Sequence, residues 1–177
     1  MKNKDLIYIG SIPKITLDYA LSHVVENNWT DAAVAESRIK SYGLETKTKE
    51  IRDASVGLID EEFNKLLREN ISPLVERYAV INKINISKLE GYHIVKYEKG
   101  QFFKEHIDQT QEFPRKISVV FYLNDNYDGG TITFTKIGFS LKPSSGSVLV
   151  FPSTEEFCHS ADPIISGTKY AIVGFWL

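Results

Sequence analysis

Two stretches in the first half of the chain repeat hydrophobic residues at the spacing of an amphipathic helix. The first follows Thr16, which we expect to be its N-cap, and ends at residues 27–28. The second begins near Asp60 and reaches Pro73, which starts a new helix or kinks the same one. The hydrophobic positions are Leu17, Leu21, Val24, Val25, Phe63, Leu66, Leu67, Val75 and Tyr78. Neither stretch groups reactive side chains, so both are predicted to be packing elements.

From about residue 85 the pattern changes to short apolar or alternating runs separated by Gly, Pro, Asn and Asp. Such a series of short strands predicts a sandwich or barrel rather than a parallel sheet with crossover helices. We expect one domain, 1–177, of the α+β class but mainly β, in which helices of about 1–85 cover a β core of about 86–177. The predicted strands are 89–97, 102–108, 117–123, 131–135, 139–142, 147–151, the neighbourhood of His159, and 169–176.

Charge and composition narrow the expected binding partners and cellular location. The 21 Lys and Arg residues nearly balance the 23 Asp and Glu residues, so we expect neither nucleic acid nor a membrane as partner. The single cysteine, Cys158, allows no internal disulfide. The N-terminus carries no long apolar run, and no run of 18 apolar residues occurs elsewhere. A cytoplasmic protein is expected.

The first candidate for chemistry is the triplet His106-Ile107-Asp108. Residues two apart in a strand project from the same face, so an imidazole and a carboxylate could occupy adjacent positions around a metal ion. Taken alone, His-x-Asp is common and also fits an ordinary surface pair. His159 follows a strong apolar strand and is the candidate third ligand.

Two histidines and one carboxylate leave coordination positions open, which suits non-haem Fe(II) and oxygen activation better than structural zinc. The open positions can take a bidentate 2-oxo acid and dioxygen. Lys169 shares a predicted strand face with apolar Ala171, Val173 and Phe175, where a lysine is costly unless it is paired or reaches solvent. The distal carboxylate of 2-oxoglutarate would pair with it, whereas a strand-end lysine reaching water is the simpler alternative.

Taken in order, these residues resemble the 2-oxoglutarate/Fe(II) oxygenase superfamily, and most of all its prolyl 4-hydroxylase-like branch. The matching segments are Lys96-Tyr97-Glu98-Lys99-Gly100 leading to His106-Ile107-Asp108, Phe121-Tyr122-Leu123-Asn124-Asp125, Tyr127-Asp128-Gly129-Gly130, Val148-Leu149-Val150-Phe151, His159, Gly167-Thr168-Lys169 and Trp176. They cover the second half of the chain, and Arg52 to Ser55 resembles an upstream Arg-x-Ser element. Ile132 departs from the pattern, because many members have Thr there, which weakens any transfer of substrate specificity.

The resemblance implies a double-stranded β-helix (jelly-roll) core and His106, Asp108 and His159 as iron ligands. It also implies that Lys169 binds 2-oxoglutarate and that Tyr97 and Tyr122 line the cosubstrate pocket, although a core ring is an equal alternative for Tyr122. The implied activity is that of a 2-oxoglutarate-dependent dioxygenase, procollagen-proline 4-dioxygenase-like, with O2 as second cosubstrate and ascorbate as reductant.

Several alternatives stay open at the level of sequence. The substrate implied by the resemblance is a prolyl residue in a peptide or protein, whereas another amino acid or a small metabolite fits the same residues. A cupin-like metalloprotein would hold a metal without using 2-oxoglutarate, and Lys169 argues against it. A jelly-roll binding module with merely structural histidines would be no enzyme at all.

Overall fold

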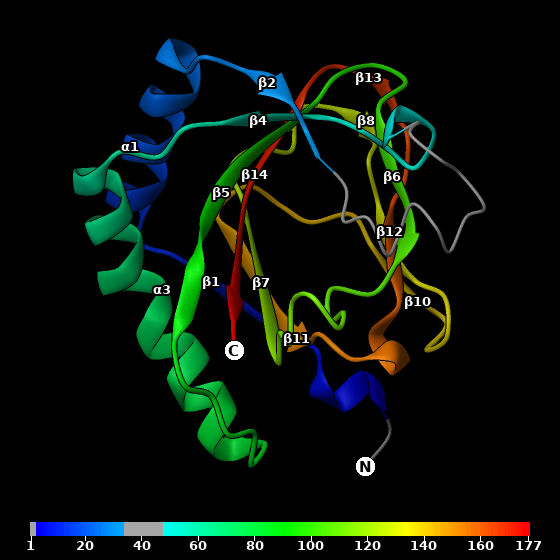
Figure 1. Ribbon diagram of the computed structural model, residues 1–177. Helices are drawn as coiled ribbons and strands as arrows, with labels where there is room; N and C mark the ends of the chain where they lie inside the picture. Colours follow the sequence, from blue (N-terminus) through cyan, green and yellow to red (C-terminus); the bar gives the residue numbers. More distant parts are fainter. Residues whose placement is uncertain (1–2, 34–47) are drawn as a thin grey trace.

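The computed structural model describes residues 3–33 and 48–177. Two antiparallel sheets face each other and form the core, and two long helices cover the outer side of the larger sheet (Figure 1). This mainly β arrangement agrees with the sandwich or barrel predicted from the strand pattern. It leaves the space between the two sheets for the polar residues that concern function.

The larger sheet has seven strands, and its order places strands distant in sequence side by side. The C-terminal strand β14 lies between β7 and β5 and pairs with both along most of its length. In sheet order the strands are β1 (Tyr8–Ser11), β11 (Ser147–Pro152), β7 (Ile117–Tyr122), β14 (Lys169–Trp176), β5 (Leu89–Tyr97), β4 (Ser55–Gly57) and β2 (Thr30–Asp31).

The smaller sheet has five strands, and a separate two-stranded ribbon lies at one end of the core. In sheet order the five strands are β10 (Phe139–Leu141), β9 (Ile132–Phe134), β12 (His159–Ala161), β6 (Phe102–His106) and β3 (Arg52–Asp53). The ribbon consists of β13 (Ile164–Ser166) and β8 (Asp128–Gly129). Short 3-10 helices span Asn3–Leu6, Thr48–Glu50 and Glu155–Phe157.

The two long helices are α1 (Lys14–Glu26) and α3 (Glu61–Ile81). Asp60 caps α3, because its carboxylate accepts a hydrogen bond from the backbone N–H of Phe63. Pro73 lies inside this one continuous helix, so it does not start a new one. The prediction that Thr16 caps the first helix is wrong: the capping position is Pro13, and Thr16 is buried within the helix.

Alternation along the larger sheet separates two hydrophobic clusters. One face, with Ile94, Phe121 and Ile172, packs against Phe63, Leu67 and other residues of α1 and α3. The opposite face turns toward the smaller sheet and carries a second cluster. The inward positions of the three central strands are Val95, Tyr97, Val120, Tyr122, Lys169, Ala171, Val173 and Phe175.

All eight predicted strands are present, with ends shifted by at most two residues. The prediction missed the short strands β1, β2, β3, β4, β8 and β13. The first four come from the part of the chain predicted to be helical, and each has only two to four residues, too few for an alternating pattern to appear. The N-terminal part therefore adds strands to both sheets as well as helices.

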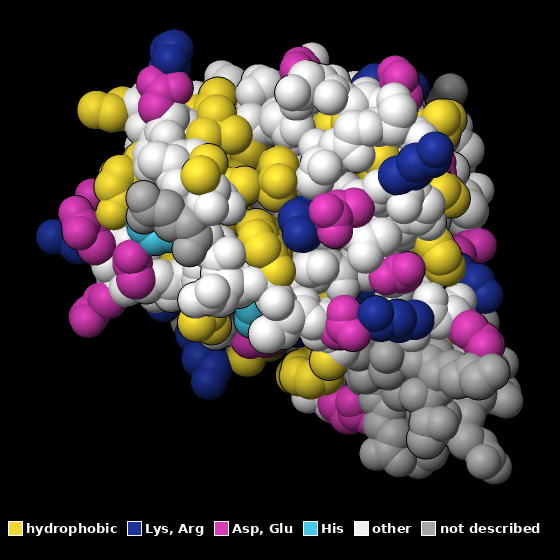
Figure 2. All heavy atoms as spheres, turned by 90° about the horizontal axis from the view of Figure 1, so that it is seen from above, with side chains coloured by type: hydrophobic (Ala, Val, Ile, Leu, Met, Phe, Trp, Pro, Cys, Tyr) yellow, Lys and Arg dark blue, Asp and Glu magenta, His cyan; other side chains and the backbone are white. Residues whose placement is uncertain are grey.

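Charged side chains of both signs are scattered over the face in Figure 2, with hydrophobic side chains visible between them. Within residues 3–33 and 48–177, neither helix combines the length and the apolar character needed to cross a membrane.

Candidate active site

His106 and His159 come together through strand pairing. They are direct partners on the antiparallel strands β6 and β12, and their ring centroids lie 4.3 Å apart. Side chains of such a pair project from the same face. Strand pairing therefore brings His159, the candidate third ligand, next to His106 although the two are 53 positions apart in sequence.

A β-bulge shapes β6 next to this pair. His106 lies opposite His159, whereas Phe103 lies opposite Ala161, so three residues of β6 span two of β12. The extra residue brings Phe103 and His106 to the same face although they are three positions apart. Their rings stack with centroids 3.6 Å apart and an interplanar angle of 15°.

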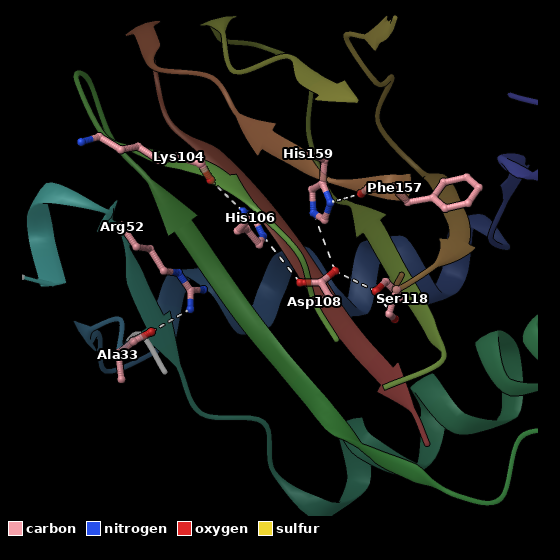
Figure 3. A network of polar contacts seen from close by, with 9 residues as sticks. Ala33, Arg52, Lys104, His106, Asp108, Ser118, Phe157 and His159 are labelled. Atoms are coloured by element: carbon pink, nitrogen blue, oxygen red, sulfur yellow. Dashed lines mark hydrogen bonds and ion pairs between the residues drawn. The ribbon is translucent and has the colours of Figure 1, made fainter. Parts of the chain in front are cut away.

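Asp108 completes the cluster from just beyond the end of β6. Its carboxylate oxygens lie 3.5 Å from His106 Nε2 and 3.7 Å from His159 Nε2. The strand predicted over 102–108 therefore ends two residues early, but His106 and Asp108 still project into the same space (Figure 3). One donor atom from each of the three buried residues lies within 4.8 Å of the others.

Backbone carbonyls fix the orientation of both imidazoles. His106 Nδ1 donates to the carbonyl of Lys104 at 2.7 Å, and His159 Nδ1 donates to the carbonyl of Phe157 at 2.9 Å (Figure 3). Because a carbonyl can only accept, each Nδ1 carries the proton, and in the neutral ring Nε2 keeps its lone pair. Both lone pairs face Asp108, which is the arrangement that metal-binding histidines adopt.

Two serines hold the carboxylate. Ser118 donates to Asp108 Oδ2 at 2.7 Å, and Ser153 lies 2.7 Å from the Ser118 hydroxyl. Burial raises the pKa of Asp108, but the positive charge that His159 and His106 carry when protonated and the hydrogen bond from the Ser118 hydroxyl outweigh it and hold this pKa well below its usual range. The carboxylate is therefore ionised at neutral pH and available as a ligand.

The donor set fits a divalent transition metal. Two imidazole nitrogens and a carboxylate on one side leave the other coordination positions open toward the pocket. A structural zinc site would need a fourth protein ligand. Within the described parts of the chain, no further His, Cys, Asp or Glu joins the cluster.

The cluster forms part of the wall of a pocket of about 430 Å³ between the two sheets. Inward residues of β5, β7 and β14 form one side, and Phe103, Ile132 and Ala161 belong to the other. The wall is mostly apolar with a few convergent polar groups, as is usual for small-molecule sites. All residues predicted for iron and 2-oxoglutarate line this one pocket: His106, Asp108, His159, Lys169, Tyr97 and Tyr122.

Lys169 is 3% exposed, so the alternative in which it reaches water is excluded. Its Nζ donates to the carbonyl of Gly130 at 2.6 Å and lies 5.2 Å from the centroid of the Tyr122 ring. Burial lowers the pKa of Lys169 to about 8, an effect that Asp162 partly opposes. The ammonium therefore has neutral neighbours at hydrogen-bonding distance and remains mostly charged at pH 7, which fits a site for a carboxylate.

Three tyrosine rings surround this ammonium. Tyr97 is the strand partner of Lys169, and its ring centroid lies 5.9 Å from Nζ, as does that of Tyr127. Burial raises the pKa values of Tyr97 and Tyr122, so both hydroxyls are protonated and can donate. The Tyr127 hydroxyl is buried without a hydrogen-bond partner in the described structure. The sequence analysis gave Tyr127 no role, although it directly precedes Asp128-Gly129-Gly130.

Sequence reasoning also missed two residues of the pocket wall, Arg115 and Phe113. The strand parity of His93 with Tyr97 allows a role near the pocket, although a partly buried structural histidine is the simpler interpretation of the sequence. In the structure His93 is exposed and lines the pocket. His23 on α1 lies outside the pocket wall, packs on Phe63 and contacts Asp60 at 2.8 Å. Cys158 lies 3.3 Å from Glu105, away from the cluster.

Comparison with known proteins agrees with this geometry. Residues 92–177 match the family model described as the 2OG-Fe(II) oxygenase superfamily. A protein of Acanthamoeba polyphaga mimivirus, named "Putative prolyl 4-hydroxylase", is 26% identical over 126 residues. The match covers 60% of this chain and 52% of the viral protein, so it spans about half the length of that relative.

Solved structures share the fold over nearly the whole chain. The viral collagen prolyl hydroxylase of Paramecium bursaria Chlorella virus-1, in complex with 2-oxoglutarate, has a TM-score of 0.70 at 17% identity and covers 97% of this chain and 95% of its own. A Trichoplax adhaerens prolyl hydroxylase, bound to a peptide of hypoxia inducible factor, has a TM-score of 0.72 at 19% identity and covers 99% and 84%.

This likeness confirms the predicted fold, a jelly-roll core with flanking helices. The family match covers the strands that carry both histidines, Asp108 and Lys169. Residues 92–177, just under half of the chain, are thus similar to the 2OG-Fe(II) oxygenase superfamily, and the relatives that share its sequence or its fold carry prolyl hydroxylase names.

Proposed function

We propose that this protein is a 2-oxoglutarate- and Fe(II)-dependent dioxygenase that hydroxylates an amino-acid residue of a peptide or protein, in the first place a prolyl residue. One observation carries the proposal: His106, Asp108 and His159 line the same pocket as the buried cation of Lys169. In the balanced reaction, a substrate C–H bond, O2 and 2-oxoglutarate give a C–OH group, succinate and CO2.

In this proposal the Nε2 atoms of His106 and His159 and the carboxylate of Asp108 hold the iron. Lys169 binds the distal carboxylate of 2-oxoglutarate, and the hydroxyls of Tyr97 and Tyr122 donate hydrogen bonds to the cosubstrate. Bound Fe(II) and 2-oxoglutarate supply the activation of O2, coupled to oxidative decarboxylation. Ser118, Ser153 and the two backbone carbonyls keep the ligands oriented before any ion binds.

The apolar pocket wall has its own part in the reaction. Val95, Val120, Ala171 and Val173 lie between the two sheets and offer no hydrogen bond to water through their side chains. A substrate residue that enters the pocket displaces solvent, and the reaction is thereby directed to that residue rather than to the protein.

The reductant, location, domain organisation and partners of the proposed enzyme are inferred from the sequence. We include ascorbate as the reductant, by resemblance to the family, and a cytoplasmic location, because the chain has one cysteine. We also include a single domain over 1–177, and neither nucleic acid nor membrane as partner, because the net charge is only −2.

The test is turnover of proline-containing peptides with Fe(II), 2-oxoglutarate, ascorbate and 18O2. We expect succinate formation and the gain of one labelled oxygen atom in the peptide. Asp108→Ala should abolish both, whereas Asp18→Ala, which removes an exposed carboxylate on α1, should abolish neither. Turnover that persists in Asp108→Ala would refute the ligand assignment. Peptide oxidation that needs no 2-oxoglutarate would favour the cupin-like alternative.

A further inference from the structure

The charged side chains of the pocket wall are not balanced. Among the described residues, three of them are basic (Arg52, Arg115 and Lys169) and one is acidic (Asp108). Asp108 belongs to the metal cluster, and Lys169 lies in the tyrosine-lined part of the pocket. The two arginines therefore remain to be explained.

Arg115 is neutralised within the protein. Its Nε donates to Glu90 at 2.9 Å, and a terminal nitrogen contacts the other oxygen of the same carboxylate. The guanidinium carbon lies 3.6 Å from the ring centroid of Phe175 and 4.7 Å from that of Phe113. A bidentate carboxylate pair between two aromatic rings satisfies both the charge and the flat faces of the guanidinium.

Arg52 has no such partner in residues 3–33 and 48–177. One terminal nitrogen donates to the carbonyl of Ala33 at 3.2 Å, and Nε is buried without a hydrogen-bond partner (Figure 3). A carbonyl is uncharged, so the guanidinium has no carboxylate partner within residues 3–33 and 48–177. Arg52 is half-buried, and a cation that is partly withdrawn from water attracts an anion.

The position of Arg52 connects it to the metal cluster. Its guanidinium carbon lies 4.8 Å from the ring centroid of Phe103, and that ring stacks on His106. One aromatic ring therefore separates the cation from a proposed iron ligand. The field of Arg52 also extends into the pocket, because it contributes to lowering the pKa of His93 and opposes the rise that burial causes in the pKa of Tyr97.

We propose that Arg52 binds a carboxylate of the substrate, so that the enzyme acts on a residue with an acidic group close to the carbon that is hydroxylated. The carboxylate belongs either to an acidic residue next to the target in a peptide or to a free amino acid. Arg52 would receive it through its planar fork of N–H groups. This inference rests on the proposed hydroxylase function and names its substrate class.

The test compares ligands that differ only in the anionic group. One pair is a proline-containing peptide with Glu or Gln next to the proline, and the other is free proline against prolinamide. Binding is measured by calorimetry, first without added metal or cosubstrate and then with Fe(II) and 2-oxoglutarate under anaerobic conditions. Wild-type protein should bind the acidic member of one pair at least about tenfold more tightly, as expected for a charge-assisted bidentate pair.

Variants assign this preference to the guanidinium. Arg52→Gln should bring the ratio of the two affinities close to one, and Arg52→Lys should keep part of it. Arg77→Gln, which removes an exposed arginine on α3, is the matched control and should keep the full ratio. If Arg52→Gln does not fold, the salt dependence of the wild-type ratio decides, because an ion-pair preference must decline as ionic strength rises.

The outcomes separate this inference from the proposed function. Equal binding of acidic and amide ligands, a preference that survives Arg52→Gln, or a ratio unaffected by salt would overturn the role of Arg52. Oxygen incorporation into both peptides with equal efficiency would support the hydroxylase function but not the role of Arg52. An acidic preference without oxygen incorporation would retain the anion site and overturn the hydroxylase.

Discussion

The two functional parts of the pocket hold their polar groups in opposite ways. In the metal cluster both imidazoles donate to backbone carbonyls and Asp108 accepts from Ser118, so the donor geometry is fixed in the protein alone. Lys169 is instead surrounded by tyrosine rings and has a carbonyl as hydrogen-bond acceptor. The first part is organised before its ligand arrives, whereas the second has a charge without a carboxylate at hydrogen-bonding distance in residues 3–33 and 48–177. Affinity for the metal should therefore depend on hydrogen bonds, and affinity for the cosubstrate on charge.

The largest effect should come from removing a metal ligand. His159→Ala takes away one of three donors and opens space beside His106, so stoichiometric binding of Fe(II) or Mn(II) at micromolar concentration should be lost. Calorimetric titration with Mn(II) under anaerobic conditions measures this directly. His23→Ala, at a histidine between the helices, is the control and should keep full binding.

Lys169→Met tests the tyrosine-lined part of the pocket. It should lower the affinity for 2-oxoglutarate and raise the melting temperature. Loss of a charge-assisted contact should weaken 2-oxoglutarate binding by about 2 kcal/mol, roughly thirtyfold in Kd. The melting temperature should rise, because a buried cation without an acidic partner is replaced by a side chain that packs in an apolar site. Lys65→Met, at an exposed lysine of α3, should change neither property. A melting temperature that falls in Lys169→Met would mean that the buried ammonium stabilises the fold.

Ser118→Ala should weaken the metal site without touching a ligand. Removing an outer hydrogen bond to a ligating carboxylate typically costs about 10-fold to 100-fold in metal affinity. Ser166→Ala is the matched control. The Ser166 hydroxyl donates to Asp128 within the β13–β8 ribbon, which is a separate sheet from the one that carries the two histidines. Unchanged Mn(II) affinity in Ser118→Ala would mean that strand geometry alone holds Asp108.

Stability and affinity for 2-oxoglutarate should both depend on pH through Lys169. The pKa of Lys169 is about 8 in the folded protein against 10.5 for an ordinary lysine, so between these values the unfolded chain binds more protons. Stability from this group therefore rises as pH increases from 8 toward 10.5, by at most roughly 3 kcal/mol. Affinity for 2-oxoglutarate should fall over the same range, because the ammonium is lost. Both trends should disappear in Lys169→Met, which urea unfolding and cosubstrate titration from pH 7 to 10 would measure.

The smallest effect is expected at Cys158, next to a proposed ligand in sequence. Its thiol points toward Glu105, and burial raises its pKa to about 11, so no thiolate is available near the metal at neutral pH. Cys158→Ala should leave Mn(II) affinity within about twofold of wild type, well below the effect expected for an outer hydrogen bond. A larger loss would assign the cysteine a part in orienting His159.

Sequence patterns predicted the long central strands and the site residues because these features repeat or stand in a fixed order. Alternation places Lys169, Ala171, Val173 and Phe175 on one face, and the structure places all four in the pocket wall. Short pairings were not predictable in this way, because β3 and β13 have two or three residues and depend on their partners in the sheet.

The surroundings of Arg52 within the described residues were also beyond sequence reasoning. Its neighbour Ala33 is 19 positions away, and the aromatic ring beneath it belongs to another strand. The pairing of Arg115 with Glu90 joins positions 25 residues apart. Which of the two arginines has a carboxylate partner among the described residues is decided by packing between segments and not by any local pattern.

The bulge in β6 has a consequence for how the metal site is encoded. Its additional residue lets the Phe103 ring stack on His106 and leaves the Lys104 carbonyl facing the imidazole. Pairing of the same residues without a bulge would direct His106 and Phe103, three positions apart, to opposite sides of the sheet. No metal-binding side chain would be altered, yet His106 would lose either the ring that stacks on it or its place beside His159. The geometry around the proposed iron ligands is thus specified by a count of residues as much as by their chemical identity.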